Sequence, residues 1–249
     1  RIYCGIIADN TYLYLGTDNG ILVYNYRTDK YEQPDTDFPT DVRTMVLQGD
    51  TLWIGSLNGL YTYQLKSRQL NHFDSKQTGL PHNTIYSIIH TKDNQIYIGT
   101  YNGLCRYVQA SGKFENILLP VNRGGSNLFV NSLLEDTTRQ CIWIGMEGYL
   151  FQYNPTTGEM KAIEVFHNNS IKSLALDGDE NLLAGTDNGL YVYQNDKEPL
   201  QHIIHDSRNI QSLTNNIIWN IFSDQEHNIW LGTDYGISLS RYNSCLLYT

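Results

Sequence analysis

The 249-residue chain lacks features that would place it in several large protein classes. It has no apolar run of about eighteen residues or more, so we expect no membrane-spanning helix and no direct membrane insertion. Its formal net charge is −9 and it has no basic stripe, which argues against nucleic acid as a partner. The four cysteines show no CxxC or other metal-ligand spacing, so we expect free thiols and no metal site.

Sequence motifs for catalysis are missing as well. There is no G-x-S-x-G, no P-loop, no G-x-G-x-x-G and no H-E-x-x-H. His202 and His205 are three residues apart in a strand-like segment and should point to opposite faces, so they are not expected to chelate one metal. We therefore expect a protein that is not an enzyme and that needs no cofactor.

What the chain does have is an internal repeat. Six times a short apolar run leads into a glycine, a few residues follow, and a second glycine precedes an aromatic-rich run. The leading glycines, spaced by 39 to 47 residues, are Gly16, Gly55, Gly99, Gly145, Gly185 and Gly232. In four copies an Asn-Gly pair lies between the two apolar runs. This pair favours a type I′ hairpin turn, because both central residues of that turn have positive φ.

Each repeat resolves into four short strands. In the third repeat they are expected at 84–90, 96–100, 103–107 and 114–118, with polar breaks between them and no stripe of helical period. Four strands per unit, repeated radially, predict an all-β fold, a β-propeller of four-stranded antiparallel blades. A single domain, 1–249, would contain blade units at 1–38, 39–79, 80–125, 126–168, 169–212 and 213–249. Closure of such a ring would bring Cys4 and Cys245 together.

Two recurring positions are expected to serve packing. The leading glycine lies inside a strand, where glycine normally weakens pairing, so its recurrence indicates a close approach between backbones of neighbouring blades. Aromatic residues recur in the same strand, and we expect them in the core between blades: Trp53, Tyr97, Trp143 and Trp230.

Two stretches of the chain resemble the two-component regulator propeller repeat. One is Ser212–Asp224 followed by Asn228–Gly236, and the other is Gly79–Ile88 followed by Ile96–Gly103. The resemblance implies the periplasmic sensor region of a Bacteroides-type hybrid two-component system histidine kinase. In such receptors two consecutive seven-bladed propellers precede a β-sandwich, a membrane helix and the kinase, and the signals are oligosaccharides.

The resemblance also implies what surrounds this chain. With six units and no kinase, the chain is expected to be a fragment of a seven-bladed or double propeller, and its start at Arg1 agrees with an excised piece. Its implied partners are an oligosaccharide, the second propeller and the β-sandwich of the same receptor, with a homodimer as a further option.

One position in the innermost strands varies while its neighbours stay similar. Aligned on apolar anchors, it is occupied by Cys4, Arg43, Tyr86, Asn131, Lys172 and Trp219. Such side chains suit sugar recognition, because rings stack on sugar faces and polar groups meet hydroxyls. The loops entering these strands add His82 and Arg123. The candidate ligand-binding residues are therefore Arg43, Tyr86, Asn131, Lys172, Trp219, His82 and Arg123, and ordinary packing between blades is the alternative interpretation.

Three functions compete at this point. The first is an oligosaccharide sensor, supported by the resemblance and by the variable position. The second is a scaffold for protein–protein interaction or receptor dimerisation without a ligand of its own. The third is a propeller lyase or hydrolase whose catalytic residues come from distant blades, which no sequence motif supports.

Overall fold

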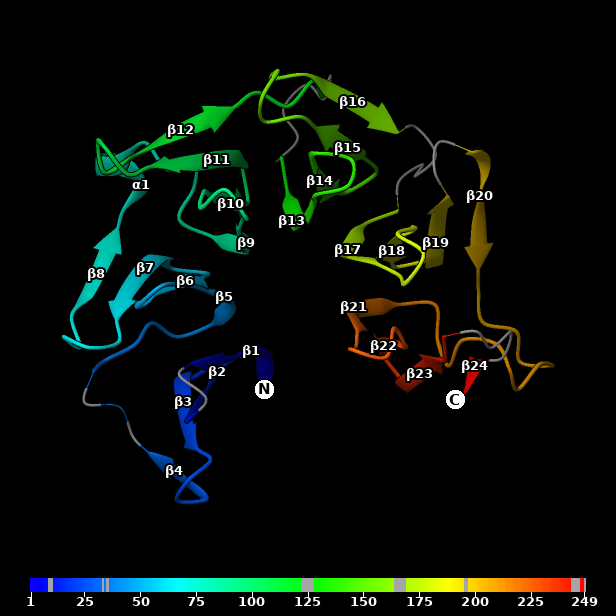
Figure 1. Cartoon of the computed structure of the whole chain (residues 1–249), viewed down its shortest axis with the longest axis horizontal. Helices are drawn as coiled ribbons and strands as arrows, with labels where there is room; N and C mark the ends of the chain where they lie inside the picture. Colours follow the sequence, from blue (N-terminus) through cyan, green and yellow to red (C-terminus); the bar gives the residue numbers. More distant parts are fainter. Residues whose placement is uncertain are drawn as a thin grey trace. The chain divides into compact units, whose positions relative to one another are not determined.

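Six four-stranded antiparallel sheets make up the computed structural model, each built from four strands that are consecutive in sequence (Figure 1). The structure describes residues 1–8, 11–32, 34, 36–121, 128–163, 169–194, 197–242 and 247–248. The sheets are numbered here as blades 1 to 6. The predicted all-β propeller of four-stranded blades is confirmed.

The first three blades lie in a unit that spans residues 1–130. Blade 1 consists of β1 (Ile2–Ala8), β2 (Tyr12–Thr17), β3 (Gly20–Asn25) and β4 (Lys30–Glu32). Blade 2 consists of β5 (Val42–Gln48), β6 (Thr51–Ser56), β7 (Gly59–Gln64) and β8 (Leu70–Phe73). A short helix, α1 (Ser75–Thr78), precedes blade 3, which consists of β9 (Ile85–His90), β10 (Ile96–Thr100), β11 (Gly103–Val108) and β12 (Lys113–Ile117).

The last three blades lie in a second unit, residues 131–249. Blade 4 consists of β13 (Val130–Asp136), β14 (Cys141–Met146), β15 (Leu150–Tyr153) and β16 (Met160–Ile163). Blade 5 consists of β17 (Ile171–Leu176), β18 (Leu182–Thr186), β19 (Gly189–Gln194) and β20 (Lys197–Ile203). Blade 6 consists of β21 (Ile218–Ser223), β22 (Ile229–Thr233), β23 (Gly236–Ser240) and β24 (Leu247–Tyr248). That all six form a single domain stays a prediction.

The hairpin between the second and third strands is held by one recurring device. Thr17, Thr100 and Thr186 each donate a side-chain hydroxyl to the carbonyl of the glycine three residues later, at 2.9 Å. The same hydroxyl oxygen accepts the amide two residues on. Ser56 and Thr233 do the same in blades 2 and 6. Blade 4 has Met146 at this position, and there Glu147 instead forms an isolated bridge with Ser170.

The strand glycines allow the close approach that their recurrence predicts. A β-carbon on Gly16 would lie 2.7 Å from Val42 Cγ1, and one on Gly55 would lie 2.6 Å from Ile85 Cγ2. Each of these contacts joins the second strand of one blade to the first residue of the next. Gly145 meets Ile171 and Gly185 meets Ile218 in the same way. A glycine is therefore required wherever a following blade packs this closely.

The aromatic residues of the second strand lie in the core, with one exception. Trp53, Tyr97 and Trp143 are no more than 3% exposed, as expected. Trp230 is 39% exposed, so the expectation was wrong for blade 6. Gly232 explains why, because the nearest atoms to a β-carbon there belong to its own blade, at 3.8 Å. Among the described residues, nothing covers this face of blade 6.

The described cysteines are free thiols. They are Cys4, Cys105 and Cys141. Burial raises the pKa of Cys4 to about 12 and that of Cys141 to about 11, so both stay protonated at neutral pH. Cys245 lies outside the described residues, and its pairing with Cys4 stays a prediction.

Candidate functional site

The position that varies in sequence coincides with a β-bulge. In five blades the pairing between the first and second strands skips one residue near the start of the first strand. The skipped residues are Tyr3, Arg43, Tyr86, Lys172 and Trp219. A bulged residue is unpaired and its side chain is re-aimed, so the ladder does not restrict which residue stands there.

Blade 4 carries Asn131 in the corresponding place. Asn131 directly precedes Ser132, whose Oγ faces Gly145 just as Ser87 Oγ faces Gly99 in blade 3. Five blades therefore place one side chain outside the strand pairing at the start of the first strand, and blade 4 has Asn131 at the equivalent place. We name these six residues, Tyr3, Arg43, Tyr86, Asn131, Lys172 and Trp219, the bulge residues.

The alignment of the six innermost strands with one another was wrong by one residue in blade 1. It placed Cys4 at the variable position, but Cys4 pairs with Gly16, as Thr44 pairs with Gly55 and Ser173 with Gly185. The small thiol fills the space that a Ser or Thr side chain occupies in other blades. The bulge residue of blade 1 is Tyr3.

In the first unit the bulge residues centre on a cation. The guanidinium carbon of Arg43 lies 3.8 Å from the ring centroid of Tyr3, and Nη2 lies 3.5 Å from Asp41 Oδ1. The Nε atom is buried and has no hydrogen-bond partner. Stacking on a ring together with a nearby carboxylate holds the guanidinium in place. Its outer nitrogens are therefore held in one orientation.

A row of rings continues from the bulge residue of blade 3. Tyr86 lies 5.2 Å from Phe129, Phe129 lies 4.1 Å from Tyr101, and Tyr101 lies 5.1 Å from His82, all between ring centroids. Burial raises the pKa of the Tyr86 hydroxyl, and the charge of Arg43 opposes that shift only in part. Tyr86 is therefore a neutral hydrogen-bond donor at physiological pH. His82 Nδ1 accepts the Thr84 amide at 3.0 Å, which gives this histidine a role in the turn.

In the second unit the bulge residues centre on an indole. The Lys172 Nζ atom lies 4.5 Å from the ring centroid of Trp219. The indole Nε1–H of Trp219 donates to Asp234 Oδ1. Asn131 Nδ2 donates to Ser170 Oγ at 3.2 Å. This group combines a cation, a ring and amide and hydroxyl groups, which is the chemistry that sugar recognition uses.

The structure brings several of the predicted residues together within each unit, although the partner of Asn131 is Ser170 and not another predicted residue. Arg43 lies close enough to Tyr86 to affect its pKa, and His82 is linked to Tyr86 through two rings. Lys172 contacts Trp219. Arg123 lies outside the described residues. That these side chains bind a ligand stays a prediction.

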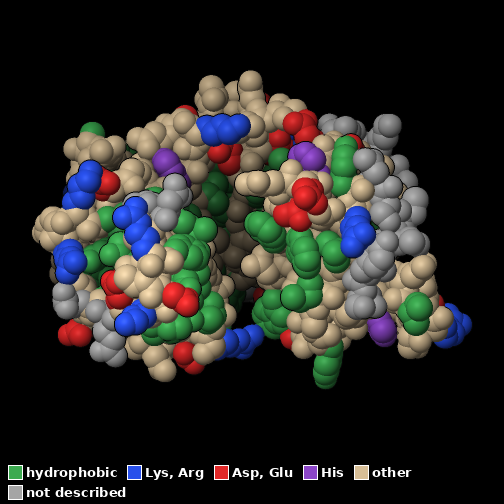
Figure 2. All heavy atoms as spheres, turned by 60° about the horizontal axis from the view of Figure 1, so that its bottom comes forward, with side chains coloured by type: hydrophobic (Ala, Val, Ile, Leu, Met, Phe, Trp, Pro, Cys, Tyr) green, Lys and Arg blue, Asp and Glu red, His purple; other side chains and the backbone are tan. Residues whose placement is uncertain are grey.

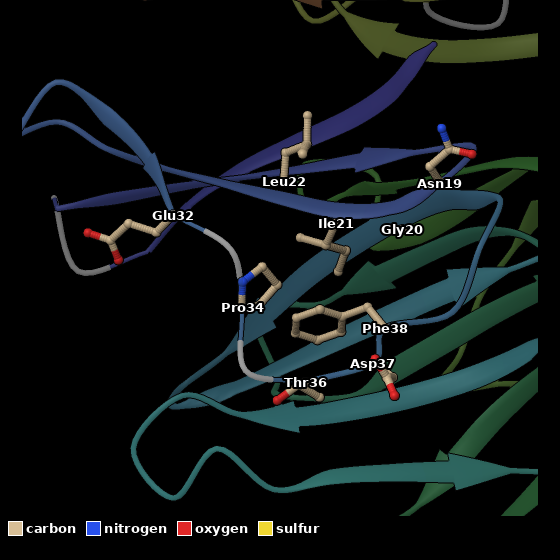
Figure 3. Close-up of a pocket in the computed structure, with 9 residues that line it drawn as sticks. All are labelled: Asn19, Gly20, Ile21, Leu22, Glu32, Pro34, Thr36, Asp37 and Phe38. Atoms are coloured by element: carbon tan, nitrogen blue, oxygen red, sulfur yellow. The ribbon is translucent and has the colours of Figure 1, made fainter.

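Sequence analysis missed a pocket of about 270 Å³ at the edge of blade 1 (Figure 3). Ile21 and Phe38 face each other inside it, and the carboxylates of Glu32 and Asp37 lie toward opposite ends. Pro34 was the available signal, because proline lacks the amide that would extend β4 along β3. A second hollow, about 460 Å³, lies over the outer strands of blade 4 and is lined by Arg139, Cys141, Gln152, Asn154, Glu159, Met160 and Lys161.

Among the described residues, the acidic side chain with the greatest burial is that of Asp136, and its role is structural. Asp136 is fully buried and accepts hydrogen bonds from Trp143 Nε1 at 3.0 Å, the Arg139 amide at 3.0 Å and Arg139 Nη1 at 2.6 Å. Burial alone would raise its pKa, but these bonds hold the pKa below the usual value of 3.8. Within the described part of the chain, no group of three or more His, Cys, Asp or Glu side chains could hold a metal ion.

Comparison with protein families confirms the resemblance. The model described as "Two component regulator propeller" matches residues 79–102 and 212–235, within blades 3 and 6. A curated relative, "Histidine kinase P4" from Formosa agariphila, is 27% identical over 197 residues, which cover 73% of this chain and 14% of that protein.

Solved structures are similar over the whole chain. Two crystal structures of the extracellular domain of BT4673 from B. thetaiotaomicron, described as a one-component and as a hybrid two-component system, match with TM-scores of 0.95 and 0.96. Both are 81% identical over 98% of this chain, which spans 33% of theirs. A streptogramin B lyase, at 13% identity and a TM-score of 0.74 over all of this chain and 82% of its own, shares the fold alone. No helix among the described residues is long and apolar enough to cross a bilayer.

Proposed function

We propose that this chain, which carries two-component regulator propeller repeats, is a sensing module of a hybrid two-component receptor and binds an oligosaccharide outside the cytoplasm. Its 81% identity to the extracellular domain of such a system supports this placement, and the periplasm is the compartment we assign. Binding would pass the signal to a histidine kinase elsewhere in the receptor. The kinase, a second propeller and a β-sandwich are the partners this proposal requires.

The bulge residues are the observation that carries the proposal. Strand pairing and packing fix the neighbouring positions, yet this position holds a tyrosine, an arginine, an asparagine, a lysine and a tryptophan in different blades. Arg43 on Tyr3 and Lys172 on Trp219 each pair a hydrogen-bond donor with an aromatic surface. Oligosaccharides need both kinds of contact, since sugars present C–H faces and hydroxyls together.

Thermal unfolding against a panel of plant and host oligosaccharides tests the proposal. A sugar at one hundred times its Kd should add about 2.7 kcal/mol to the free energy of unfolding. Arg43→Ala should reduce that gain. Arg106→Ala is a matched control, because Arg106 pairs with Glu115 on the outer strands of blade 3, away from the bulge residues. No gain with any glycan in the wild type, or an equal gain in Arg43→Ala, would count against binding at the bulge residues.

A scaffold function is the second candidate, and the open face of blade 6 favours it. Phe222, Trp230 and Ile237 are 61%, 39% and 59% exposed there. Figure 2 shows hydrophobic side chains gathered over this sheet. We infer that a further blade of the receptor covers this face, which would make the chain part of a larger propeller. Association that depends on Phe222, without a response to any glycan, would support the scaffold function instead.

A further inference from the structure

Trp219 differs from the other bulge residues in its exposure. The side chain of Trp219 is 48% exposed. The other five bulge residues are less exposed, and each is partly buried: Tyr3, Arg43, Tyr86, Asn131 and Lys172. Large aromatic side chains are usually highly buried, and those that are not often take part in recognition. The exposed indole therefore needs an explanation of its own.

Two contacts fix the indole of Trp219 in place. Lys172 Nζ lies over the ring, and Asp234 accepts the Nε1–H at the ring edge. Lys172 forms no ion pair within the described part of the chain, so its ammonium is not neutralised by a carboxylate there. A ring held both across one face and at its edge has little freedom to turn. Its exposed area is then a flat, pre-oriented surface.

Trp230 provides an internal comparison in the same blade. Its Nε1 also donates to a carboxylate, Asp224 Oδ2, at 2.9 Å, and it is also exposed. Its counterparts Trp53 and Trp143 are buried, however, so Trp230 occupies a packing position whose cover is absent. Trp219 occupies a bulge position, where strand pairing does not restrict the side chain, and it is the exposed member among the six bulge residues. Trp230 is therefore a core residue without its cover, whereas Trp219 is a side chain outside the strand pairing that is held by Lys172 and Asp234 with part of its indole open.

We propose that Trp219 is the stacking platform for a pyranose ring of the bound oligosaccharide. This inference rests on the proposed function and names the sugar class that the same site takes. A pyranose chair presents a flat set of C–H groups that matches an indole face, whereas a puckered furanose presents a smaller one. Asp234 at the ring edge and the Lys172 ammonium are positioned to meet the sugar hydroxyls. Both act as positioning residues for the indole as well.

Binding of neutral oligosaccharides to the chain tests the platform. The probes are tetrasaccharides of pyranose units, namely those of β-1,4-glucan, β-1,4-galactan, β-1,4-mannan and β-1,4-xylan, and furanose oligosaccharides of arabinan and fructan. Calorimetry gives the Kd, and tryptophan emission shows whether an indole is covered. We expect at least one pyranose probe to bind and to change the emission.

Three variants locate the contact. Trp219→Ala should weaken pyranose binding by about tenfold or more, and Trp219→Phe, which keeps a smaller ring, should weaken it less. Trp230→Phe is the matched control and should bind as the wild type does, with the emission change retained. In Trp219→Phe the emission change should vanish while binding is still measurable, which a merely structural role of Trp219 would not produce.

Each other outcome is decisive. Wild-type affinity in both Trp219 variants, or loss of the emission change in Trp230→Phe, overturns the platform and leaves oligosaccharide sensing in place. Binding of furanose probes alone does the same. Failure of every probe to bind the folded wild-type chain overturns the platform and the proposed function together.

Discussion

At the scale of single residues, the contact between a strand glycine and the first β-branched residue of the next blade recurs along the chain. It appears between Gly16 and Val42, and again between Gly185 and Ile218. Each pair sets how closely two sheets approach, and the aromatic residues beside it complete the core. Because the contact involves backbone as well as side-chain atoms, the sheets cannot separate slightly to admit a larger residue without losing that packing.

Gly99→Ala should destabilise the chain severely. The new β-carbon would lie 2.3 Å from Ser87 Oγ, 2.6 Å from Val130 Cγ1 and 2.8 Å from the Val130 carbonyl oxygen. We expect a loss at or above the upper end of the usual overpacking range, about 3 kcal/mol, measured by urea unfolding. Gly232→Ala is the matched control. With nothing nearer than 3.8 Å, it should be neutral or stabilise by up to about 1 kcal/mol. Equal effects at both positions would contradict this account.

Asp136→Asn should lower the free energy of unfolding by about 1–3 kcal/mol. The substitution removes a buried charge, leaves the Arg139 guanidinium without an anionic partner and replaces one of two acceptor oxygens by an NH2 donor. Asp224 accepts the Trp230 indole in a similar way but on an open face, so Asp224→Asn should have a smaller effect. Urea unfolding of both variants at neutral pH measures the difference.

The same carboxyl predicts a pH dependence. Its pKa in the folded chain is below 3.8, so the ionised form stabilises the fold at pH above the unfolded value. That stability is lost as pH falls through the folded pKa. The wild type should therefore lose its advantage over Asp136→Asn progressively as the pH falls below 3.8, as followed by unfolding midpoints. An advantage that does not diminish as the pH falls below 3.8 would contradict the assignment.

At the scale of elements, the sequence predicted the hairpins well and the bulges poorly. The Asn-Gly pairs and the preceding Thr or Ser specify a turn locally, so the third blade's strands could be placed from the sequence alone. The bulge at Arg43 or Lys172 depends on pairing with a second strand, which no single strand reveals. The variable position could still be recognised because its residue type changes from blade to blade. In blade 1 it was assigned to Cys4 instead of Tyr3, because an alignment on apolar residues does not show which residue the strand pairing skips.

The outer strands should differ in their protection from hydrogen exchange. Strand β4 pairs through only three residues, all exposed, whereas β12 pairs through five and buries Phe114. Fewer buried contacts and shorter ladders open at lower free energy. Amides of β4 should exchange faster than those of β12, as measured by mass spectrometry of peptides from the same sample. Equal rates would show that packing elsewhere protects β4.

At the scale of the whole molecule, the architecture could be predicted from the sequence more completely than the arrangement of the candidate site. A period repeated six times leaves few alternatives to a propeller. The variable position coincides with the bulge residues except in blade 1, yet it could not show that Arg43 stacks on Tyr3 or that Lys172 covers Trp219. Those pairs join residues from different blades, and their geometry depends on how sheets pack. Exposure of Trp230 was equally hidden, because its sequence context matches that of buried counterparts.

The open face of blade 6 leads to a prediction about the longer receptor. Phe222 is 61% exposed, so Phe222→Ser should leave the stability of this chain within about 0.5 kcal/mol of the wild type. If a further blade covers the face, the same substitution in the full extracytoplasmic region should cost about 3 kcal/mol, as for a buried phenylalanine. Gly232→Ala should show the same contrast. It should not destabilise this chain, but it should destabilise the full extracytoplasmic region, because a packed blade would bring a β-branched residue against the new β-carbon.

Thermal and urea unfolding of both variants in both proteins measure this contrast, with Leu118→Ser as the control. Leu118 is 90% exposed and lies outside the blade 6 face, so its substitution should be silent in both. If Phe222→Ser and Gly232→Ala leave the stability of the longer protein unchanged, the face stays open in the receptor. An exposed apolar sheet face of that kind is typical of a site for association with another protein, so this result would support the scaffold function.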